Sequence, residues 1–447
     1  MIEQSRPFVV RADWLIPLEA EPISNGILVI NRGRVEFVGD HLPGEFCSAK
    51  QYNLSGFAIL PGLVNSHCHL EFSDLAQPIP AGDSFPAWIG RLIAYRKSKS
   101  EDPKQLALVR EAAIAAGIRE SYEAGVRWVI DITTEPWNPD WIDHAVDCIF
   151  TELPLDIAPS PPITIQPCIE IVDITGKRFE QTLAFTMKQA SAPESLSRGR
   201  MGLAPHAPYT ASPNATRMSA ELSRTDNRLV TMHLAESSDE MEWLGKRTGG
   251  FSELLGSIVL ADYFDRLGPI SDHVQCLTQA WRSTIAHGNY LTQCELADLA
   301  TYAERMAIVH CPRTHRHFGH VHDSSTRYPL AERVALGVRH FLGTDSRASN
   351  PDLNLWSEAK LLRTEHPSMS SIQILKMITT DATSFLGIVD KVGAISVGKP
   401  STLTAIKLSK RSLVPSPSVQ TNEIYDAVLD EETSSAPLEL ILNSIGR

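Results

Sequence analysis

Several apolar, strand-like runs of this chain end in histidine or aspartate, and this pattern limits how the chain can fold. The first run leads into His67-Cys68-His69, and three later runs lead to His233, His287 and Asp345. Residues i and i+2 of a strand point to the same side, so the rings of His67 and His69 can reach one metal ion. A fold that gathers the ends of these strands would bring all of these side chains together.

The middle of the chain, residues 58–388, alternates such runs with helical runs, which is typical of βα units in a parallel sheet or barrel. The expected strands are 59–64, 127–132, 148–152, 202–206, 229–233, 284–287, 307–310 and 339–343. The expected helices are 104–124, 213–224, 236–247, 293–305, 351–364 and 371–386. This pattern predicts an α/β fold, a (β/α)8 TIM barrel with insertions. A doubly wound open sheet is the alternative, but no Gly-x-Gly-x-x-Gly follows the first strand.

The two ends of the chain, residues 1–57 and 389–447, differ from the middle because they are rich in short strands and turns. Asn31-Arg32-Gly33 separates two alternating apolar runs, which indicates a β-hairpin. We therefore predict one small β-sandwich domain formed from both termini, beside a barrel domain at 58–388.

The amino-acid composition limits the kinds of molecule that this protein is expected to bind. The formal net charge is -12, whereas a surface that binds nucleic acid or anionic membranes needs an excess of Lys and Arg. No apolar segment reaches membrane-spanning length, and the N-terminal residues lack a signal-peptide pattern. We expect a cytoplasmic protein whose partner is a small-molecule substrate, with no nucleic-acid or membrane partner.

In a barrel, the strand-end residues would lie at the C-terminal face, where the active sites of such barrels are found. Three imidazoles and one carboxylate suit a catalytic zinc or iron that keeps an open position for water. Each residue alone also has an ordinary structural interpretation. Asp345 could cap the following helix, and Glu236 could occupy the first turn of its helix.

Four motifs together resemble those of the amidohydrolase superfamily, in its branch with one divalent metal ion and no carbamylated lysine. They are His67-Cys68-His69, His233-Leu234-Ala235-Glu236, His287-Gly288 and Leu342-Gly343-Thr344-Asp345-Ser346. Ala204-Pro205-His206 and His310-Cys311-Pro312-Arg313 extend the resemblance over nearly the whole chain. The branch contains deaminases of purines, adenosylhomocysteine and methylthioadenosine, and the triazine hydrolases.

The resemblance implies a role for each matching residue. The implied ligands of one divalent ion are His67, His69, His233 and Asp345. Zinc is the ion we expect, with iron and manganese as alternatives, because all three accept imidazoles and a carboxylate. Asp345 would also take a proton from the attacking water, Glu236 would protonate the substrate ring, and His287 would orient the water. His206 would contact the substrate.

A narrower resemblance concerns the segment after the first motif. His69-Leu70-Glu71-Phe72-Ser73, followed by Phe85-Pro86-Ala87-Trp88, is similar to the aminodeoxyfutalosine deaminases, which serve the futalosine route to menaquinone. It implies that ammonia is released from aminodeoxyfutalosine, with Glu71, Trp88 and Arg313 as substrate contacts. Trp88 could equally be an ordinary packing residue.

Other functions stay open. The enzymatic alternatives are a deaminase of S-adenosylhomocysteine, methylthioadenosine, adenosine or guanine, and a triazine-type chlorohydrolase. The non-catalytic alternative is a scaffold with the same fold. The histidines at 315, 317, 320 and 322 could form a second metal site, but we expect a solvated, substrate-facing loop. Thr314-His315 and Arg347 depart from the usual pattern of the family, and a homodimer is compatible with the resemblance.

Overall fold

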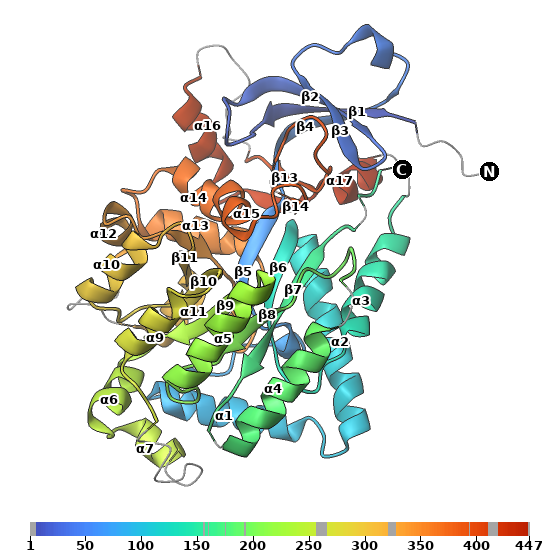
Figure 1. The fold of residues 1–447 in the computed structure, drawn as a ribbon. Helices are drawn as coiled ribbons and strands as arrows, with labels where there is room; N and C mark the ends of the chain where they lie inside the picture. The colour runs from blue at the N-terminus through green and yellow to red at the C-terminus, as the bar shows by residue number, and fades with distance from the viewer. Residues whose placement is uncertain are drawn as a thin grey trace.

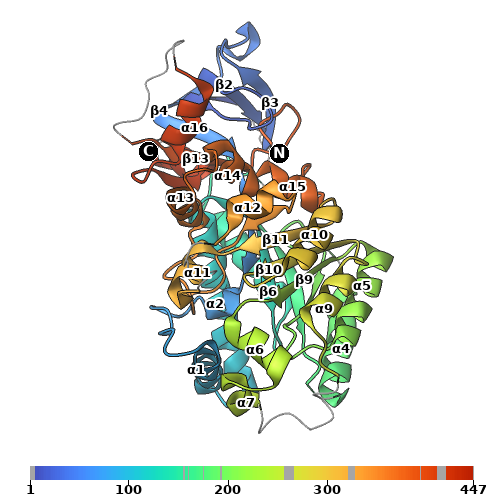
Figure 2. The same cartoon turned by 90° about the vertical axis from the view of Figure 1, so that its left-hand side faces the viewer.

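The fold is a barrel of parallel strands joined to a second sheet that the two ends of the chain build together (Figure 1). The computed structural model describes residues 6–154, 157–159, 161–174, 176–191, 194–255, 266–320, 328–392, 394–409 and 419–445. Two perpendicular views place the terminal sheet at one end of the molecule and helices α1, α6 and α7 at the other (Figure 2).

Eight strands form the barrel and follow one another around it in chain order, each parallel to its neighbours. They are β5 (Leu63–Cys68), β6 (Val126–Thr133), β7 (Thr164–Ile171), β8 (Gly202–Pro205), β9 (Leu229–Leu234), β10 (Arg282–His287), β11 (Met306–His310) and β12 (His340–Leu342). The predicted (β/α)8 barrel is confirmed.

The barrel closes where the last strand meets the first. The backbone N–H of Asp345 donates to the carbonyl of His67 at 3.1 Å, just beyond the end of β12. Asn65 and Thr344 reinforce this contact, because the amide of Asn65 donates to Thr344 Oγ1 at 2.8 Å and accepts from its backbone N–H at 3.1 Å. Gly343 leaves room for this approach, since a Cβ there would lie 2.7 Å from the His67 carbonyl oxygen.

Helices cover the outside of the barrel and form the walls at the C-terminal ends of its strands (Figure 1). They are α1 (Phe85–Ser98), α2 (Pro103–Glu123), α3 (Pro139–Thr151), α4 (Gly176–Ala190), α5 (Pro213–Asp226), α6 (Ser238–Lys246), α7 (Gly250–Leu255), α9 (Ile270–Leu277), α10 (Gln293–Thr301), α11 (Pro312–Phe318), α12 (Leu330–Ala335), α13 (Leu355–Glu365), α14 (Ser371–Met377) and α15 (Thr380–Leu386). In the described part of the chain, none of these helices is both long and apolar enough to cross a membrane.

The terminal sheet has six strands in the order β14-β13-β4-β1-β2-β3. They are β1 (Phe8–Leu15), β2 (Ile23–Asn31), β3 (Arg34–Gly39), β4 (Lys50–Pro61), β13 (Leu403–Lys407) and β14 (Ser434–Pro437), accompanied by α16 (Thr421–Val428) and α17 (Leu438–Ile445). The expected hairpin is present, with Arg32 and Gly33 both at positive φ as a two-residue turn requires. Arg127, near the start of β6, donates to both carboxylate oxygens of Glu439 at 2.5 and 2.6 Å and so ties the sheet to the barrel.

Two expected strands are wrong. Residues 59–64 are divided between β4 of the terminal sheet and β5 of the barrel. Residues 148–152 belong to the end of α3 and the turn after it, because Asn138 caps a helix whose apolar residues recur at helical spacing. The third strand of the barrel is instead β7. This strand was not predicted, because Pro167 interrupts an otherwise strand-like run.

We predict that Gly343→Ala destabilises the protein by about 1–3 kcal/mol, because the new methyl group would overlap backbone atoms of His67. Gly245→Ala, in α6, is the matched control, since a Cβ there has no neighbour within 4 Å. A helical Gly→Ala change should stabilise by about 0.5–1 kcal/mol. Urea unfolding measures both, and equal stabilities of the two variants would contradict the described closure.

Candidate metal centre and active site

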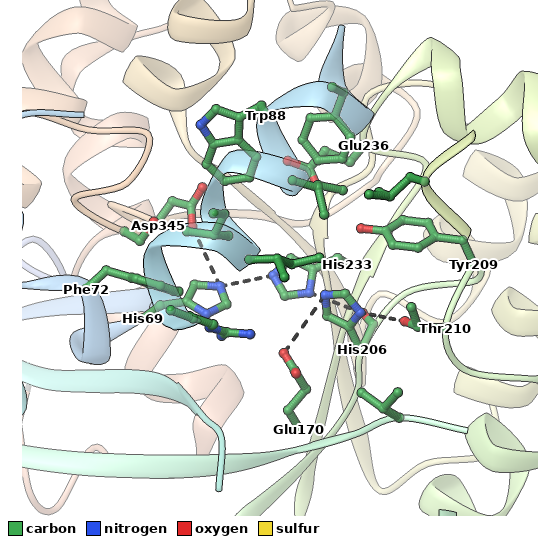
Figure 3. Close-up of a pocket in the computed structure, with 18 of the residues that line it drawn as sticks. His69, Phe72, Trp88, Glu170, His206, Tyr209, Thr210, His233, Glu236 and Asp345 are labelled. Carbon is green, nitrogen blue, oxygen red and sulfur yellow. Dashed lines mark hydrogen bonds and ion pairs between the residues drawn. The ribbon is translucent and has the colours of Figure 1, made fainter. Parts of the chain in front are cut away.

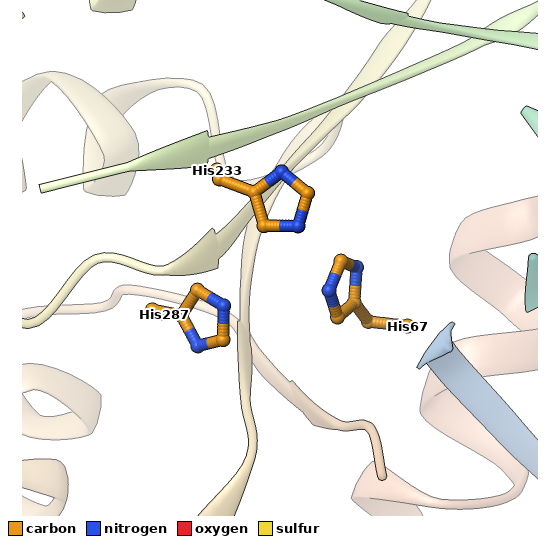
Figure 4. Close-up of side chains that lie close together, drawn as sticks. All are labelled: His67, His233 and His287. Carbon is orange, nitrogen blue, oxygen red and sulfur yellow. The ribbon is translucent and has the colours of Figure 1, made fainter. Parts of the chain in front are cut away.

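Three imidazoles and one carboxylate converge at the C-terminal ends of the barrel strands. His67 and His69 come from the end of β5, His233 from β9, and Asp345 follows β12. The Nε2 atoms of His69 and His233 are 3.1 Å apart. Asp345 Oδ1 lies 3.6 Å from His69 Nε2 and 3.8 Å from His67 Nε2. His287, at the end of β10, faces His67 and His233 (Figure 4).

These distances fit a shared metal ion. Ligand atoms about 2.0–2.1 Å from a tetrahedral ion are about 3.3 Å from one another. Both ring nitrogens of His67 are buried and accept or donate no hydrogen bond among the described residues. Burial, reinforced by the neighbouring imidazoles, holds the pKa of His67 well below its ordinary value, and burial lowers the pKa of His233 to about 4. Neutral imidazoles have the free lone pairs that a metal ion requires.

Glu236 and His287 lie beside this cluster. His287 Nε2 is 3.5 Å from Glu236 Oε1, and both side chains are buried. Burial and the nearby charges of Asp345 and Glu240 raise the pKa of Glu236 well above its ordinary value. Burial also raises the pKa of Asp345, to about 6. Glu236 and Asp345 are both buried, and their negative charges would repel each other. This arrangement favours a state in which the pair holds a proton.

The backbone around these groups is unusual and firmly held. Ala235, His287 and Asp345 all have positive φ, at 53°, 67° and 56°. Non-glycine residues in this region are strained, and such strain gathers at functional sites. The carboxylate of Glu240 accepts from the backbone N–H of Ala235 at 3.1 Å and of Glu236 at 2.7 Å, so it holds the turn that presents the Glu236 side chain.

A cavity of about 220 Å³ opens onto the cluster (Figure 3). The predicted substrate contacts Trp88 and His206 both line it. Trp88 also packs against Phe85, with ring centroids 5.7 Å apart, so it lies at the cavity and is a packing residue as well. His206 lies near a carboxylate, with its Nε2 3.9 Å from Glu170 Oε2. Burial lowers the pKa of His206 to about 3.

The structure does not bring Glu71 and Arg313 to the cavity. The carboxylate of Glu71 is buried behind the wall and bound by two arginines, Arg96 at 2.5 Å and Arg110 at 2.9 Å. The guanidinium of Arg313 pairs with Glu358 at 2.7 Å and Asp352 at 2.8 Å. A buried charge needs such partners. These pairs join segments that are far apart in the chain, so they could not be predicted from the sequence.

The histidines after β11 also differ from expectation. His315 and His320 are buried, so the solvated loop expected there is wrong for both. His315 packs beside His310, with ring centroids 5.5 Å apart. His322 lies outside the described residues. Within the described part of the chain, the metal-competent groups consist of His67, His69, His233, His287 and Asp345.

The lining also includes residues that were not predicted as site residues, among them Phe72, Arg96, Glu170 and Tyr209. Glu170 lies on β7, the strand that was not predicted because it contains Pro167. Arg96 lies on α1, a helix outside the expected set. A signal for Phe72 is present in the sequence, because Phe72 belongs to the motif that runs from His69 to Ser73, but the motif alone does not reveal that its ring faces the cavity.

A (β/α)8 barrel with imidazoles and carboxylates gathered at its strand ends has the arrangement of metal-dependent barrel hydrolases. The chain matches the Amidohydrolase family over residues 58–432 and belongs to this family. The predicted membership is therefore confirmed, and the protein is a hydrolase that acts on carbon–nitrogen bonds.

Relatives with similar sequence carry two names. A protein of Thermodesulfovibrio yellowstonii named 5-methylthioadenosine/S-adenosylhomocysteine deaminase is 26% identical over 441 residues, covering 94% of this chain and 90% of the relative. The aminodeoxyfutalosine deaminase of Nitratiruptor sp. is 24% identical over 359 residues, covering 78% of this chain and 79% of the relative. The structure of Helicobacter pylori aminofutalosine deaminase in complex with methylthio-coformycin aligns with a TM-score of 0.74 at 17% identity, covering 96% and 97% of the two chains, which shows the shared fold.

We predict that the purified protein binds one divalent ion per chain and that His233→Ala abolishes stoichiometric binding. Loss of residues that only support metal ligands lowers affinity about 10–100-fold, so loss of a ligand should cost at least as much. His144→Ala, an exposed histidine of α3, is the control. Elemental analysis and calorimetric titration with Zn²⁺ measure the effect. Equal metal content in both variants would refute the centre.

Proposed function

We propose that this protein is a metal-dependent deaminase that removes ammonia from the purine ring of a nucleoside-like substrate. Aminodeoxyfutalosine is the favoured substrate, and zinc is the ion we assign to the centre. The observation that carries the proposal is the placement of buried Glu236 and His287, 3.5 Å apart, beside the imidazole cluster and at one cavity. In this proposal the barrel, residues 58–388, carries the activity, and residues 1–57 and 389–447 form the small domain.

The residues of the site can divide the proton transfers between them. A divalent ion lowers the pKa of bound water towards about 7 and so supplies a nucleophile at neutral pH. Glu236, whose pKa burial raises, donates a proton to the ring nitrogen and makes the adjacent carbon electrophilic. Asp345 accepts a proton from the attacking water as the new carbon–oxygen bond forms. Neutral His287 orients the water and stabilises charge on the incoming oxygen.

The second half of the reaction restores both carboxyl groups. Asp345 passes its proton to the amino group, which leaves as ammonia when the carbon–nitrogen bond breaks. Glu236 recovers a proton from the hydroxyl group on the ring carbon, which becomes a carbonyl group. One water is consumed and one ammonia is released, and each residue ends in its starting state.

Two observations support a nucleoside substrate of the aminodeoxyfutalosine type. Trp88 and Phe72 line the cavity together with His206, and aromatic side chains with a few polar groups suit a flat base. The motif after His69 resembles that of aminodeoxyfutalosine deaminases, and one relative carries that name. The 26% identity to a methylthioadenosine/S-adenosylhomocysteine deaminase over 94% of the chain favours those nucleosides as the second candidate.

A substrate panel tests this choice. We expect the highest kcat/KM for aminodeoxyfutalosine when ammonia release is measured beside S-adenosylhomocysteine, methylthioadenosine, adenosine, guanine and an aminotriazine. A higher kcat/KM for methylthioadenosine or S-adenosylhomocysteine would select the second candidate. No turnover of any compound by protein with one bound ion would refute the deaminase and favour the scaffold or a different C–N hydrolase.

Glu236→Gln should lower kcat by about 10²–10⁴-fold, because an amide cannot carry the proton that the ring nitrogen needs. The metal content should not change, since Glu236 is not assigned as a ligand. Glu242→Gln, an exposed residue of α6 that undergoes the same chemical change, is the control. If Glu236→Gln retains normal turnover, Glu236 is not the proton donor.

A further inference from the structure

The wall of the cavity contains a buried group of charges that the proposed reaction does not use. Glu71 follows the metal-ligand motif, and its two carboxylate oxygens bind two different arginines. Arg96 of α1 lies 2.5 Å from Oε1, and Arg110 of α2 lies 2.9 Å from Oε2. Thr134 also donates to Oε1, at 2.9 Å. These four residues form what we call the Glu71 cluster.

The Glu71 cluster carries one more positive charge than negative charge. Arg110 and Thr134 already satisfy the carboxylate, and Arg110 also donates to the Thr134 carbonyl at 2.9 Å. The neighbouring cation, Lys99, is paired with its own carboxylate, that of Asp74, at 3.0 Å. A buried cation is costly unless an anion accompanies it. The single carboxylate of Glu71 is therefore shared between Arg96 and Arg110.

The second carboxyl group of this wall belongs to Glu170, which lies 3.9 Å from His206. Burial raises the pKa of Glu170, although the charge of Arg96 opposes the shift. Glu170 also lines the cavity, on the same wall as Arg96.

Arg96 is the member of the cluster that a ligand can reach. Its side chain is 31% exposed, whereas those of Arg110 and Glu71 are 7% and 5% exposed. Among the described residues that line the cavity, Arg96 is the one Lys or Arg. Its guanidinium lies over the ring of Phe72, with Cζ 4.9 Å from the ring centroid. The Phe72 ring is in turn 6.3 Å from the ring of His69, so Arg96 stands one aromatic ring away from the metal ligands.

We propose that Arg96 binds a carboxylate on the substrate tail and so makes the enzyme specific for acidic nucleosides. This inference rests on the proposed deaminase function and deepens it. Arginine forms two parallel hydrogen bonds with a carboxylate, and the Glu71 cluster holds its guanidinium in place before the substrate arrives. Aminodeoxyfutalosine carries a carboxylate, whereas methylthioadenosine and adenosine are uncharged at this end.

The test compares aminodeoxyfutalosine with its neutral methyl ester, which has the same base, sugar and aromatic ring. We expect wild-type protein to prefer the acid, and Arg96→Gln to lower kcat/KM for the acid by about 10- to 100-fold, the usual range for a hydrogen-bonded charge. The value for the ester and for methylthioadenosine should change less than about threefold. Lys97→Gln removes the same charge from an exposed neighbour on α1 and should leave all three values unchanged.

Other outcomes separate the two proposals. An equal loss for acid and ester in Arg96→Gln, with a lower unfolding temperature, would make Arg96 only a structural partner of Glu71 and overturn the inference. A larger kcat/KM for adenosine 5′-monophosphate than for the acid would mean that the anion is a phosphate. If wild-type protein deaminates none of these compounds, the proposed function fails. Calorimetric binding of acid and ester then decides the inference, because equal affinities would overturn it.

Discussion

The backbone hydrogen bond from Asp345 to His67 closes the barrel, and the site depends on it. His67 lies on the first barrel strand and Asp345 just beyond the last, and these two strands are far apart in the sequence. Closure brings the Asp345 carboxylate within 3.8 Å of the His67 ring and 3.6 Å of the His69 ring. The same closure requires glycine at 343, so the fold and the ligand set share one structural constraint.

The second feature of the site is that burial shifts its titratable groups in a consistent direction. Burial favours the neutral form of every group, so it lowers the pKa of imidazoles and raises the pKa of carboxyl groups. Burial lowers the pKa of His233 to about 4, so its imidazole is neutral at neutral pH, and it raises the pKa of Glu236 well above its ordinary value. Burial is thus the common cause of the pKa shifts of both the proposed ligands and the proposed proton donor. The strained turns at His287 and Asp345 aim these side chains into the same space.

The sequence was sufficient to predict the catalytic end of the barrel, because a parallel barrel brings all strand C-termini to one face. Any polar residue at such a strand end could therefore be assigned to the site, as were His233 and His287. The side walls could not be predicted in the same way. Arg96 lies on a helix that was not predicted. Glu170 lies on a strand that was not predicted because it contains Pro167. Glu71 and Arg313 are charged residues near motifs, but their ion-pair partners depend on tertiary packing.

This division has a consequence for specificity. The groups to which we assign the chemistry lie on strands β5, β9 and β10 and close to the ends of β5, β9 and β12, whereas Arg96 comes from α1 and its partner Arg110 from α2. Changes on α1 can alter which tail is accepted without moving a metal ligand or Glu236. Relatives with the same fold can therefore act on nucleosides with different tails, as the two names among the similar proteins suggest. In our proposal, the charge of the residue at position 96, rather than the metal centre, separates substrates with a carboxylate tail from neutral ones.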